Sequence, residues 1–180
     1  VDALLKLGFF EVRETAEGAA LVTREYQKLL EEGTMKNLIT TCCPSVNDLI
    51  EKYYPSLTKY MTPVVSPMIA HGRLIKKIYG EDVKVVFLGP CIAKKEEAVG
   101  DDRVFGAVDA ILTFEELGGW LKAEGITISE CEEKPFGNPD PRINRIYPVG
   151  GGIVKSVMEQ KEINDTYHKL YVDGLDACME

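Results

Sequence analysis

At 180 residues and 20.0 kDa, the chain has the length of one domain and can bury about 70% of the surface that its unfolded form would expose. Hydrophobic residues make up 45% of it and charged residues 28%, which excludes disordered, collagen-like and coiled-coil proteins. The formal net charge of −8 lacks the positive field that attracts phosphate, so we expect no nucleic-acid partner. No signal-peptide pattern opens the chain, and no apolar run approaches the roughly 20 residues that cross a bilayer. We therefore expect a cytoplasmic protein without membrane contact.

Short β-branched runs alternate with longer amphipathic runs along the chain. This alternation predicts an α/β fold with parallel, mixed-edge sheets flanked by helices. The first residues have the pattern of the last turns of a helix, which Gly8 ends. Further helices are predicted at residues 16–32, from 45 to about 54, 67–79, 114–123, 150 to about 160, and from 174 onward. Strands are predicted at residues 9–12, 38–41, 83–88, 107–112 and 170–172.

The ends of two predicted helices carry clear capping signals. Ser66 is a favourable N-cap and Pro67 a favourable first-turn residue for the helix at 67–79. Thr113 and Glu116 have the spacing of a capping box at the start of the helix at 114–123. These signals make the two helices the most securely bounded elements of the prediction.

Two cysteine-containing turns each follow a predicted strand. Residues 42–44 (CCP) follow the strand at 38–41, and residues 89–91 (GPC) follow the strand at 83–88. The carboxyl ends of parallel strands share one edge of a sheet, so both turns are expected to face a common site if their strands are close. Thiols there would lie near helix N-termini, whose positive charge favours thiolates and bound anionic clusters. These turns are candidates for a soft-metal site.

Three other interpretations of the cysteines remain open at this point. They can be buried small hydrophobic residues, which is common for free cysteine. A zinc site is disfavoured because no second close pair of Cys or His accompanies the adjacent Cys42 and Cys43. A redox switch through a disulfide between these neighbours would be geometrically strained. Adjacent thiols rarely chelate one metal, so the doublet suggests a different role for each cysteine.

The two turns belong to longer motifs with a specific resemblance. Residues 41–44 (TCCP) and 90–97 (PCIAKKEE) resemble T-S-C-C-P-x-W and M-P-C-x-x-K-x-x-E, the first two cluster-binding motifs of the iron-only (di-iron) hydrogenase catalytic domain. Further segments resemble the family's Y-Y-P-E, K-S-P-Q, D-V-D-A-V-L-T and G-A-T-G-G-V motifs, at residues 53–55, 66–67, 108–113 and 150–153. The resemblance thus covers nearly the whole chain and implies a hydrogenase-like α/β fold.

The resemblance also implies a cofactor and its ligands. In the family, four cysteines hold a 4Fe-4S cubane, one of which bridges to a di-iron unit with carbon monoxide, cyanide and a dithiolate amine; together they form the H-cluster. By motif position, Cys43 and Cys91 would be two of the four cubane ligands. Cys42 would instead be the thiol that passes protons to the di-iron amine.

Other residues acquire roles from the same resemblance. Lys94 would donate a charge-assisted hydrogen bond to an iron-bound cyanide, with Glu97 as a supporting acid. Ser66 and Pro67 would line the cofactor pocket. An alignment without gaps retains one of the family's two proton-relay glutamates as Glu25.

Departures from the family pattern affect the expected activity. In the same ungapped alignment Val22 replaces the second relay glutamate, which predicts slow turnover because protons hop only between groups in hydrogen-bond reach. The family's third motif, E-x-M-x-C-x-x-G-C, and its N-terminal ferredoxin-like clusters do not occur within residues 1–180. We expect residues 1–180 to be a fragment of the catalytic domain that is inactive by itself and holds no complete cluster.

Several functions remain open. The resemblance implies a domain for reversible proton reduction and hydrogen oxidation, and slow turnover leaves a hydrogen sensor and a hydrogen-metabolising enzyme equally open. Protons and hydrogen would be the reactants, with ferredoxin-like clusters or signalling modules as partners in the full-length chain. The alternative is a hydrogenase-like iron–sulfur protein of cluster assembly or regulation that turns over no hydrogen; the retained Cys42 and Lys94 argue against it. The glycines at 150–152 indicate close approach to the cofactor pocket or a helix start, and only weakly a nucleotide site.

Overall fold

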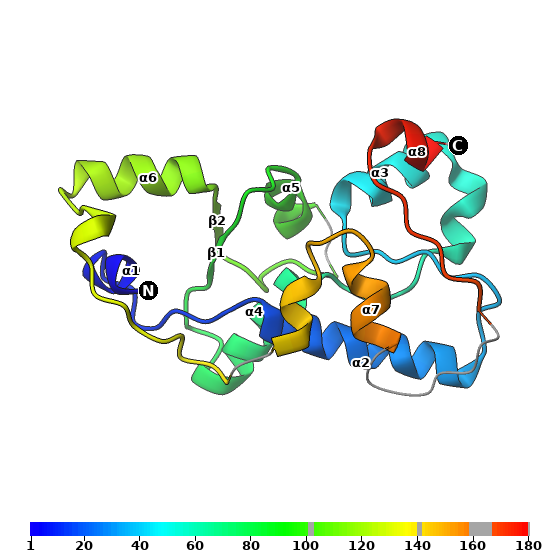
Figure 1. Cartoon of the computed structure of the whole chain (residues 1–180), viewed down its shortest axis with the longest axis horizontal. Helices are drawn as coiled ribbons and strands as arrows, with labels where there is room; N and C mark the ends of the chain where they lie inside the picture. The colour runs from blue at the N-terminus through cyan, green and yellow to red at the C-terminus, as the bar shows by residue number, and fades with distance from the viewer. Residues whose placement is uncertain (101–102, 140–141, 159–166, 180) are drawn as a thin grey trace.

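The computed structural model describes residues 1–100, 103–139, 142–158 and 167–179 (Figure 1). Helices dominate these residues, and a small sheet lies near the centre of the molecule. The α-helices are α1 (Asp2–Lys6), α2 (Ala16–Glu32), α3 (Pro44–Tyr53), α4 (Pro67–Tyr79), α5 (Ala93–Val99), α6 (Phe114–Ala123), α7 (Gly152–Met158) and α8 (Leu175–Met179). The 3-10 helices are η1 (Pro55–Tyr60), η2 (Ile128–Glu130) and η3 (Arg142–Ile146), and the strands are β1 (Val86–Leu88) and β2 (Ala110–Leu112).

The long helix α2 packs closely against α4, and this pair carries much of the fold. The crossing occurs at Gly18, where a methyl group would lie 2.2 Å from the Pro67 carbonyl oxygen. Only glycine permits so close an approach. The contact places the start of α4 beside the first turns of α2 and leaves the later turns of α2 free to pack elsewhere.

The sheet consists, among the described residues, of β1 and β2 running parallel, with Val86 opposite Ala110. Both strands are shorter than predicted. The Asp109 carboxylate accepts a hydrogen bond from the Val85 backbone N–H at 2.9 Å, so that N–H is not available to a longer ladder. The same carboxylate lies 3.0 Å from the buried Lys76 ammonium group on α4, which ties the sheet to the helix.

Two apolar clusters hold these elements together. One lies between α4, α5 and the sheet and is centred on Met68, Ile69, Val85, Ala98, Val104, Ala107 and Val108. The other joins α2 to α7 and consists of Val22, Tyr26 and Val157, with Cys42 packed against it. The second cluster therefore reaches the first cysteine turn.

The predicted α/β class is confirmed, and several predicted helices match closely. The helices predicted at 16–32, 67–79 and 114–123 have those bounds, and both capping signals form: Ser66 Oγ accepts from the Ile69 N–H, and Thr113 and Glu116 make the capping box. Helix α3 begins one residue before its predicted cap, at Pro44. Helix α7 begins at Gly152, and its predicted end at residue 160 lies outside the described residues.

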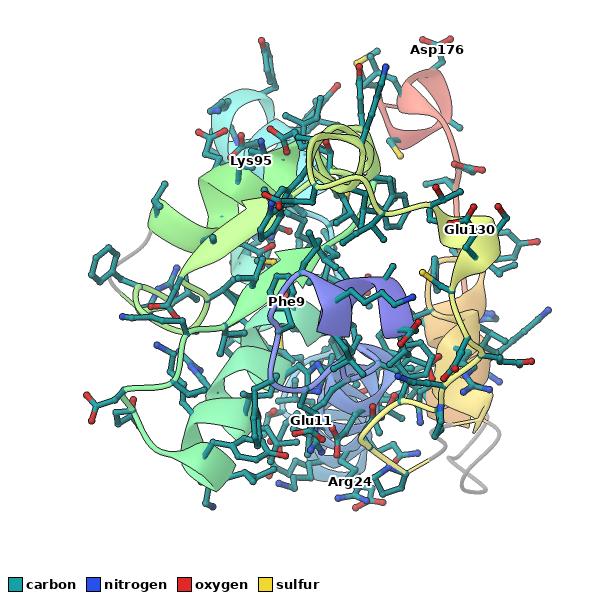
Figure 2. All side chains as sticks on the ribbon, turned by 90° about the vertical axis from the view of Figure 1, so that its left-hand side faces the viewer. Phe9, Glu11, Arg24, Lys95, Glu130 and Asp176 are labelled. Atoms are coloured by element: carbon teal, nitrogen blue, oxygen red, sulfur yellow. The ribbon has the colours of Figure 1, made fainter. Side chains whose placement is uncertain are left out.

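Three predicted strands were wrong or reduced. Residues 9–12 form no strand. The ring of Phe9, which is labelled in Figure 2, stacks edge-on against Trp120 of α6 at 5.9 Å, and the Val12 carbonyl accepts from the Gly137 N–H. Residues 170–172 form no strand either and are largely exposed. The strand at 38–41 is reduced to a single parallel bridge between Ile39 and Met61. Within the described residues, 9–12 and 170–172 have no neighbouring strand with which to pair, and 38–41 share only this one bridge with the segment at 60–64.

Candidate functional site

The first cysteine turn begins where two extended segments run side by side. Residues 38–42 lie next to residues 60–64, joined by backbone hydrogen bonds from the Ile39 N–H to the Tyr60 carbonyl and from the Thr62 N–H to the Ile39 carbonyl. Cys43 then takes an extended conformation as the N-cap of α3, and Pro44 opens the helix. The Cys43 side chain is exposed at the positive end of that helix, which suits a thiolate ligand.

Buried hydroxyl groups fix the shape of this turn. Thr41 Oγ1 donates to the Val64 carbonyl at 2.6 Å and lies 3.1 Å from Thr62 Oγ1. Thr41 also donates its backbone N–H to the Tyr26 hydroxyl at 3.0 Å. The Tyr26 hydroxyl in turn lies 3.6 Å from Cys42 Sγ. The turn is therefore held by a polar network that reaches across from α2.

The environment of Cys42 favours the protonated thiol. Burial raises the pKa of Cys42 to about 11, although the Tyr26 hydroxyl and the Lys94 charge oppose the shift. Burial also raises the pKa of the Tyr26 phenol. Both groups are therefore neutral near pH 7, and Cys42 is chemically able to carry a proton to a group bound beside it. Cys42 and its exposed neighbour Cys43 thus lie in different environments, as two roles would require.

The second cysteine turn follows β1 directly. The Gly89 N–H continues the ladder to the Leu112 carbonyl of β2 at 3.1 Å. Cys91, half-buried, comes next and accepts the Lys94 N–H at its carbonyl, just before α5 begins at Ala93. The position of Cys91 therefore depends on the register of the small sheet.

Lys94 joins the two turns. Its ammonium group donates to the Cys42 carbonyl at 3.0 Å and to Glu97 Oε2 at 2.5 Å. The side chains of Lys94 and Glu97 are only 13% and 14% exposed, so this ion pair is largely shielded from water. Helices α3 and α5, which follow the two turns, also contact each other. A hydrogen bond between residues 52 positions apart in the chain thereby brings the two motifs together.

The remaining predicted site residues have different surroundings. Ser66 is fully buried as the cap of α4, two residues beyond the Val64 carbonyl that Thr41 contacts, and Pro67 packs on Gly18. Glu25 is exposed on α2 and pairs with Lys28 at 2.6 Å. The α2 side chain that contacts Cys42 is Tyr26, not Glu25.

Sequence reasoning missed two polar side chains at this site. It gave Tyr26 no role, although a buried tyrosine hydroxyl needs a hydrogen-bond partner, and that need was the available signal. Asn47 donates to the Thr41 carbonyl at 3.0 Å. Its Oδ1 is buried and has no hydrogen-bond partner among the described residues, so it leaves an acceptor unused next to the first turn.

Two other features lie apart from the cysteine turns. A cavity of about 170 Å³ lies between residues 9–13, α4 and β1, and His71 at its wall bonds to Glu17 at 3.0 Å. Burial lowers the pKa of His71. Gly151 and Gly152 serve packing, since a methyl group at Gly152 would lie 1.7 Å from the Ile146 carbonyl oxygen and one at Gly151 would lie 3.2 Å from the Tyr171 ring. None of the helices in the described parts of the chain is long and apolar enough to cross a membrane.

Known proteins resemble this chain in sequence and in structure. It is 31% identical to the periplasmic Fe hydrogenase large subunit of Nitratidesulfovibrio vulgaris, over 99% of this chain and 48% of that protein. It is 28% identical to iron hydrogenase 1 of Clostridium pasteurianum, over 99% of this chain and 35% of that protein. The chain thus spans about half or less of the length of these relatives. It is also 27% identical to the cytosolic Fe-S cluster assembly factor NAR1 of Yarrowia lipolytica, over 62% of this chain and 26% of that protein.

Similarity to solved structures points to the same hydrogenases as the sequence similarity does. An apo FeFe-hydrogenase variant from Chlamydomonas reinhardtii superposes with a TM-score of 0.67 at 30% identity, over 76% of this chain and 39% of that one. A second variant of that enzyme gives a TM-score of 0.66 over 76% of this chain and 38% of that one, also at 30% identity. The sequence profile of the family "Iron only hydrogenase large subunit, C-terminal domain" matches residues 1–179. The chain therefore belongs to the iron-only hydrogenase family, within the C-terminal domain of the large subunit.

Proposed function

We propose that this chain forms part of the pocket of an H-cluster, with Cys43 and Cys91 as two of the four ligands of its 4Fe-4S cubane. The observation that carries the proposal is the hydrogen bond from Lys94, in the second motif, to the Cys42 carbonyl in the first. It supports a shared site because it draws both cysteine turns to one ammonium group. The chain's membership in the iron-only hydrogenase family supports an iron–sulfur cofactor as the group bound between the two turns.

The donor set fits part of such a cofactor. Thiolate sulfur is the ligand that iron–sulfur clusters take, and Cys43 is exposed at a helix N-terminus. No group of three or more His, Cys, Asp or Glu side chains able to hold a metal occurs within the described residues. The two remaining ligands are therefore proposed to come from a third cysteine motif outside residues 1–180, and ferredoxin-like clusters from other parts of the full-length protein. Residues 1–180 alone are proposed to be inactive.

Each residue of the site has a role in this proposal. When bound, the cofactor supplies an iron centre at which protons and electrons combine to give hydrogen, and at which hydrogen is split. Cys42 holds a proton on its sulfur beside that centre. Lys94 offers an ammonium donor to its anionic ligands, held in place by Glu97. Ser66 and Pro67, at the start of α4, shape the wall of the pocket.

We further propose slow turnover and a sensory role. Glu25, the one relay carboxylate that the ungapped alignment retained, is exposed and paired with Lys28, which supports a poor proton supply to Cys42. In a sensor, hydrogen and protons would react slowly while attached modules respond. Five free cysteines suit the reducing cytoplasm, which we propose as the compartment.

The second candidate function is iron–sulfur cluster assembly without hydrogen turnover. The similarity to the Yarrowia lipolytica assembly factor favours it. The retained Cys42 thiol and Lys94 count against it, because cluster assembly requires neither a proton donor nor a partner for cyanide. Hydrogen turnover by the matured protein separates the two functions.

The test uses the full-length protein, matured anaerobically, and measures iron content, the spectrum of the cubane and hydrogen–deuterium exchange with the gas. Cys43→Ser and Cys91→Ser are expected to lose cubane iron and its spectrum. Cys131→Ser is the control, because the Cys131 sulfur lies near Lys6 and Cys131 is far from both motifs in sequence. This variant should retain the cubane iron and its spectrum. Full iron content in both ligand variants would contradict the proposed cluster site, and iron without gas exchange in the wild type would favour the assembly function.

A further inference from the structure

We propose that Tyr26 is the positioning residue of the Cys42 thiol: its hydroxyl donates to the sulfur, leaves the thiol proton available, and connects Cys42, among the described residues, to a closed set of hydroxyl groups. The meaning of this inference for proton transfer rests on the proposed function. The contacts themselves do not. They belong to this chain, and they can be tested without iron.

The direction of the hydrogen bond follows from an account of donors and acceptors at the Tyr26 hydroxyl. The Thr41 backbone N–H, 3.0 Å away, can only donate, and it occupies one lone pair of the oxygen. The Thr62 hydroxyl donates to the same oxygen at 3.4 Å and occupies the second. With both lone pairs taken, the phenol has its own proton left to give. Cys42 Sγ, 3.6 Å away, is the remaining partner.

The thiol proton is therefore not used by this network. Since Cys42 accepts through its sulfur from the Tyr26 side, its S–H bond is free to point elsewhere. The Cys42 carbonyl is held from a different side by the Lys94 ammonium group, at 3.0 Å. Two donors thus hold the backbone and the sulfur of one residue, and the thiol proton is left available to a group bound beside it. Such preorganisation is what proton transfer at a fixed distance requires.

The network behind Tyr26 leads to no source of protons. The Thr62 hydroxyl shares its one proton between the Tyr26 oxygen, 3.4 Å away, and Thr41 Oγ1, 3.1 Å away. Thr41 Oγ1 directs its proton to the Val64 carbonyl at 2.6 Å, and a carbonyl has no proton to give. Tyr26, Thr41 and Thr62 are all buried. As far as the described residues trace it, the path ends in the interior, at a backbone carbonyl. Cys42 can be held in place from this side, but it cannot be resupplied with protons from it.

The first test is the infrared S–H stretching band of the apo full-length protein. The band of Cys42 is assigned from the difference spectrum of Cys42→Ala. In Tyr26→Phe the ring stays and the donor to sulfur disappears, so this band should move. Tyr147→Phe is the matched control: Tyr147 packs against the same apolar cluster, but its hydroxyl bonds to Thr23 at 2.8 Å, so the Cys42 band should stay in place. An unmoved band in a folded Tyr26→Phe protein overturns the inference.

A second variant covers the case in which Tyr26→Phe does not fold, because it leaves the buried Thr41 N–H without an acceptor. Thr62→Val keeps the shape of the side chain and removes one donor to the Tyr26 hydroxyl. It should move the Cys42 band by less than Tyr26→Phe does, and in the same direction. A band that responds to neither variant rejects the network.

The matured protein supplies a separate readout. Tyr26→Phe should retain its iron and lose about 10- to 100-fold in the rate of hydrogen–deuterium exchange with the gas, since a proton donor is misplaced. Tyr147→Phe should retain both. A protein that binds no iron refutes the proposed cofactor site but leaves the infrared result standing, whereas normal iron content with an unmoved thiol band refutes the role of Tyr26 alone.

Discussion

The two cysteine turns are held in place in different ways. Hydrogen bonds of neighbouring side chains fix the first turn, whereas the position of the second depends on the pairing of two strands. The first turn is wrapped in buried hydroxyl groups that reach it from α2 and from residues 60–64. The second is the continuation of a sheet of two three-residue strands, and it is followed by Ile92, which is 73% exposed. The Cys42 environment is thus preorganised, while the place of Cys91 depends on the register of β1 and β2.

The largest effect on stability is expected at the crossing of α2 and α4, because α2 carries the side chain that holds the first turn. In Gly18→Ala the added methyl group would lie 2.2 Å from the Pro67 carbonyl, so the helices must separate. We expect a loss of about 3 kcal/mol in the free energy of unfolding, measured by urea denaturation. Gly119→Ala on α6, where nothing lies within 4 Å, should instead gain about 0.5 to 1 kcal/mol. Equal effects at the two glycines would contradict the close crossing.

A substitution at Asp109, whose carboxylate joins β1 to α4, should destabilise the sheet that positions the second turn. Asp109→Asn leaves the buried Lys76 ammonium group without its carboxylate, at an expected cost of about 2 kcal/mol in unfolding free energy. Lys84→Met is the control, because Lys84 contacts the same carboxylate but is 77% exposed; it should cost no more than about 0.5 kcal/mol. A larger cost in Lys84→Met than in Asp109→Asn would show that the burial of Lys76 is unimportant.

The pH dependence of this variant gives an independent check. Burial opposes ionisation of Asp109, but the Val85 N–H and the ammonium groups of Lys76 and Lys84 outweigh it and lower its pKa to about 2. Because the folded pKa lies below the unfolded value of about 3.8, the stabilisation is complete above pH 4 and is lost as the pH falls through 2. The difference in stability between wild type and Asp109→Asn should therefore shrink from pH 4 to pH 2.

A smaller effect is expected from the hydroxyl groups around the first turn. Thr41→Val keeps the side-chain shape and removes the donor to the half-buried Val64 carbonyl, which should cost about 1 kcal/mol. Thr58→Val is the matched control: the Thr58 hydroxyl also donates to a carbonyl, that of Pro55 at 2.8 Å, but in an exposed position where water replaces it. Its change should stay below about 0.5 kcal/mol. Both values come from urea denaturation at pH 7.

The sequence predicted structure that depends on local contacts, and it failed where structure depends on contacts between distant residues. Local signals predicted α4 and α6 well, because Ser66 and Thr113 cap their own helices through contacts three residues away. The strands at 9–12 and 170–172 were wrong because a strand requires a partner, and partners are chosen by distant residues. In the first of these segments the ring of Phe9 found Trp120 instead.

The candidate site followed the same rule. The resemblance to the family's motifs identified Cys42, Cys43, Cys91 and Lys94 as candidate residues, and their roles remain predictions. Tyr26 escaped notice because its contact with Cys42 spans 16 residues and carries no motif. An ungapped alignment instead favoured Glu25, which the helical rotation of one residue places on the exposed side of α2. Contacts between elements therefore decide which polar side chain serves the site.

The smallest predicted effect is an energetic coupling between the two cysteine turns. Lys94 donates to the Cys42 carbonyl, next to Thr41, so Lys94→Met and Thr41→Val should not be additive. A double-mutant cycle on unfolding free energies should give a coupling of about 0.5 kcal/mol between them. Lys95→Met is the control, since Lys95 pairs with Glu116 on α6 and has no part in the first turn; with Thr41→Val it should be additive within about 0.3 kcal/mol. Additivity in both cycles would mean that the hydrogen bond from Lys94 leaves the turns energetically independent, and that any coupling between Cys42 and Cys91 would have to come from the proposed cofactor.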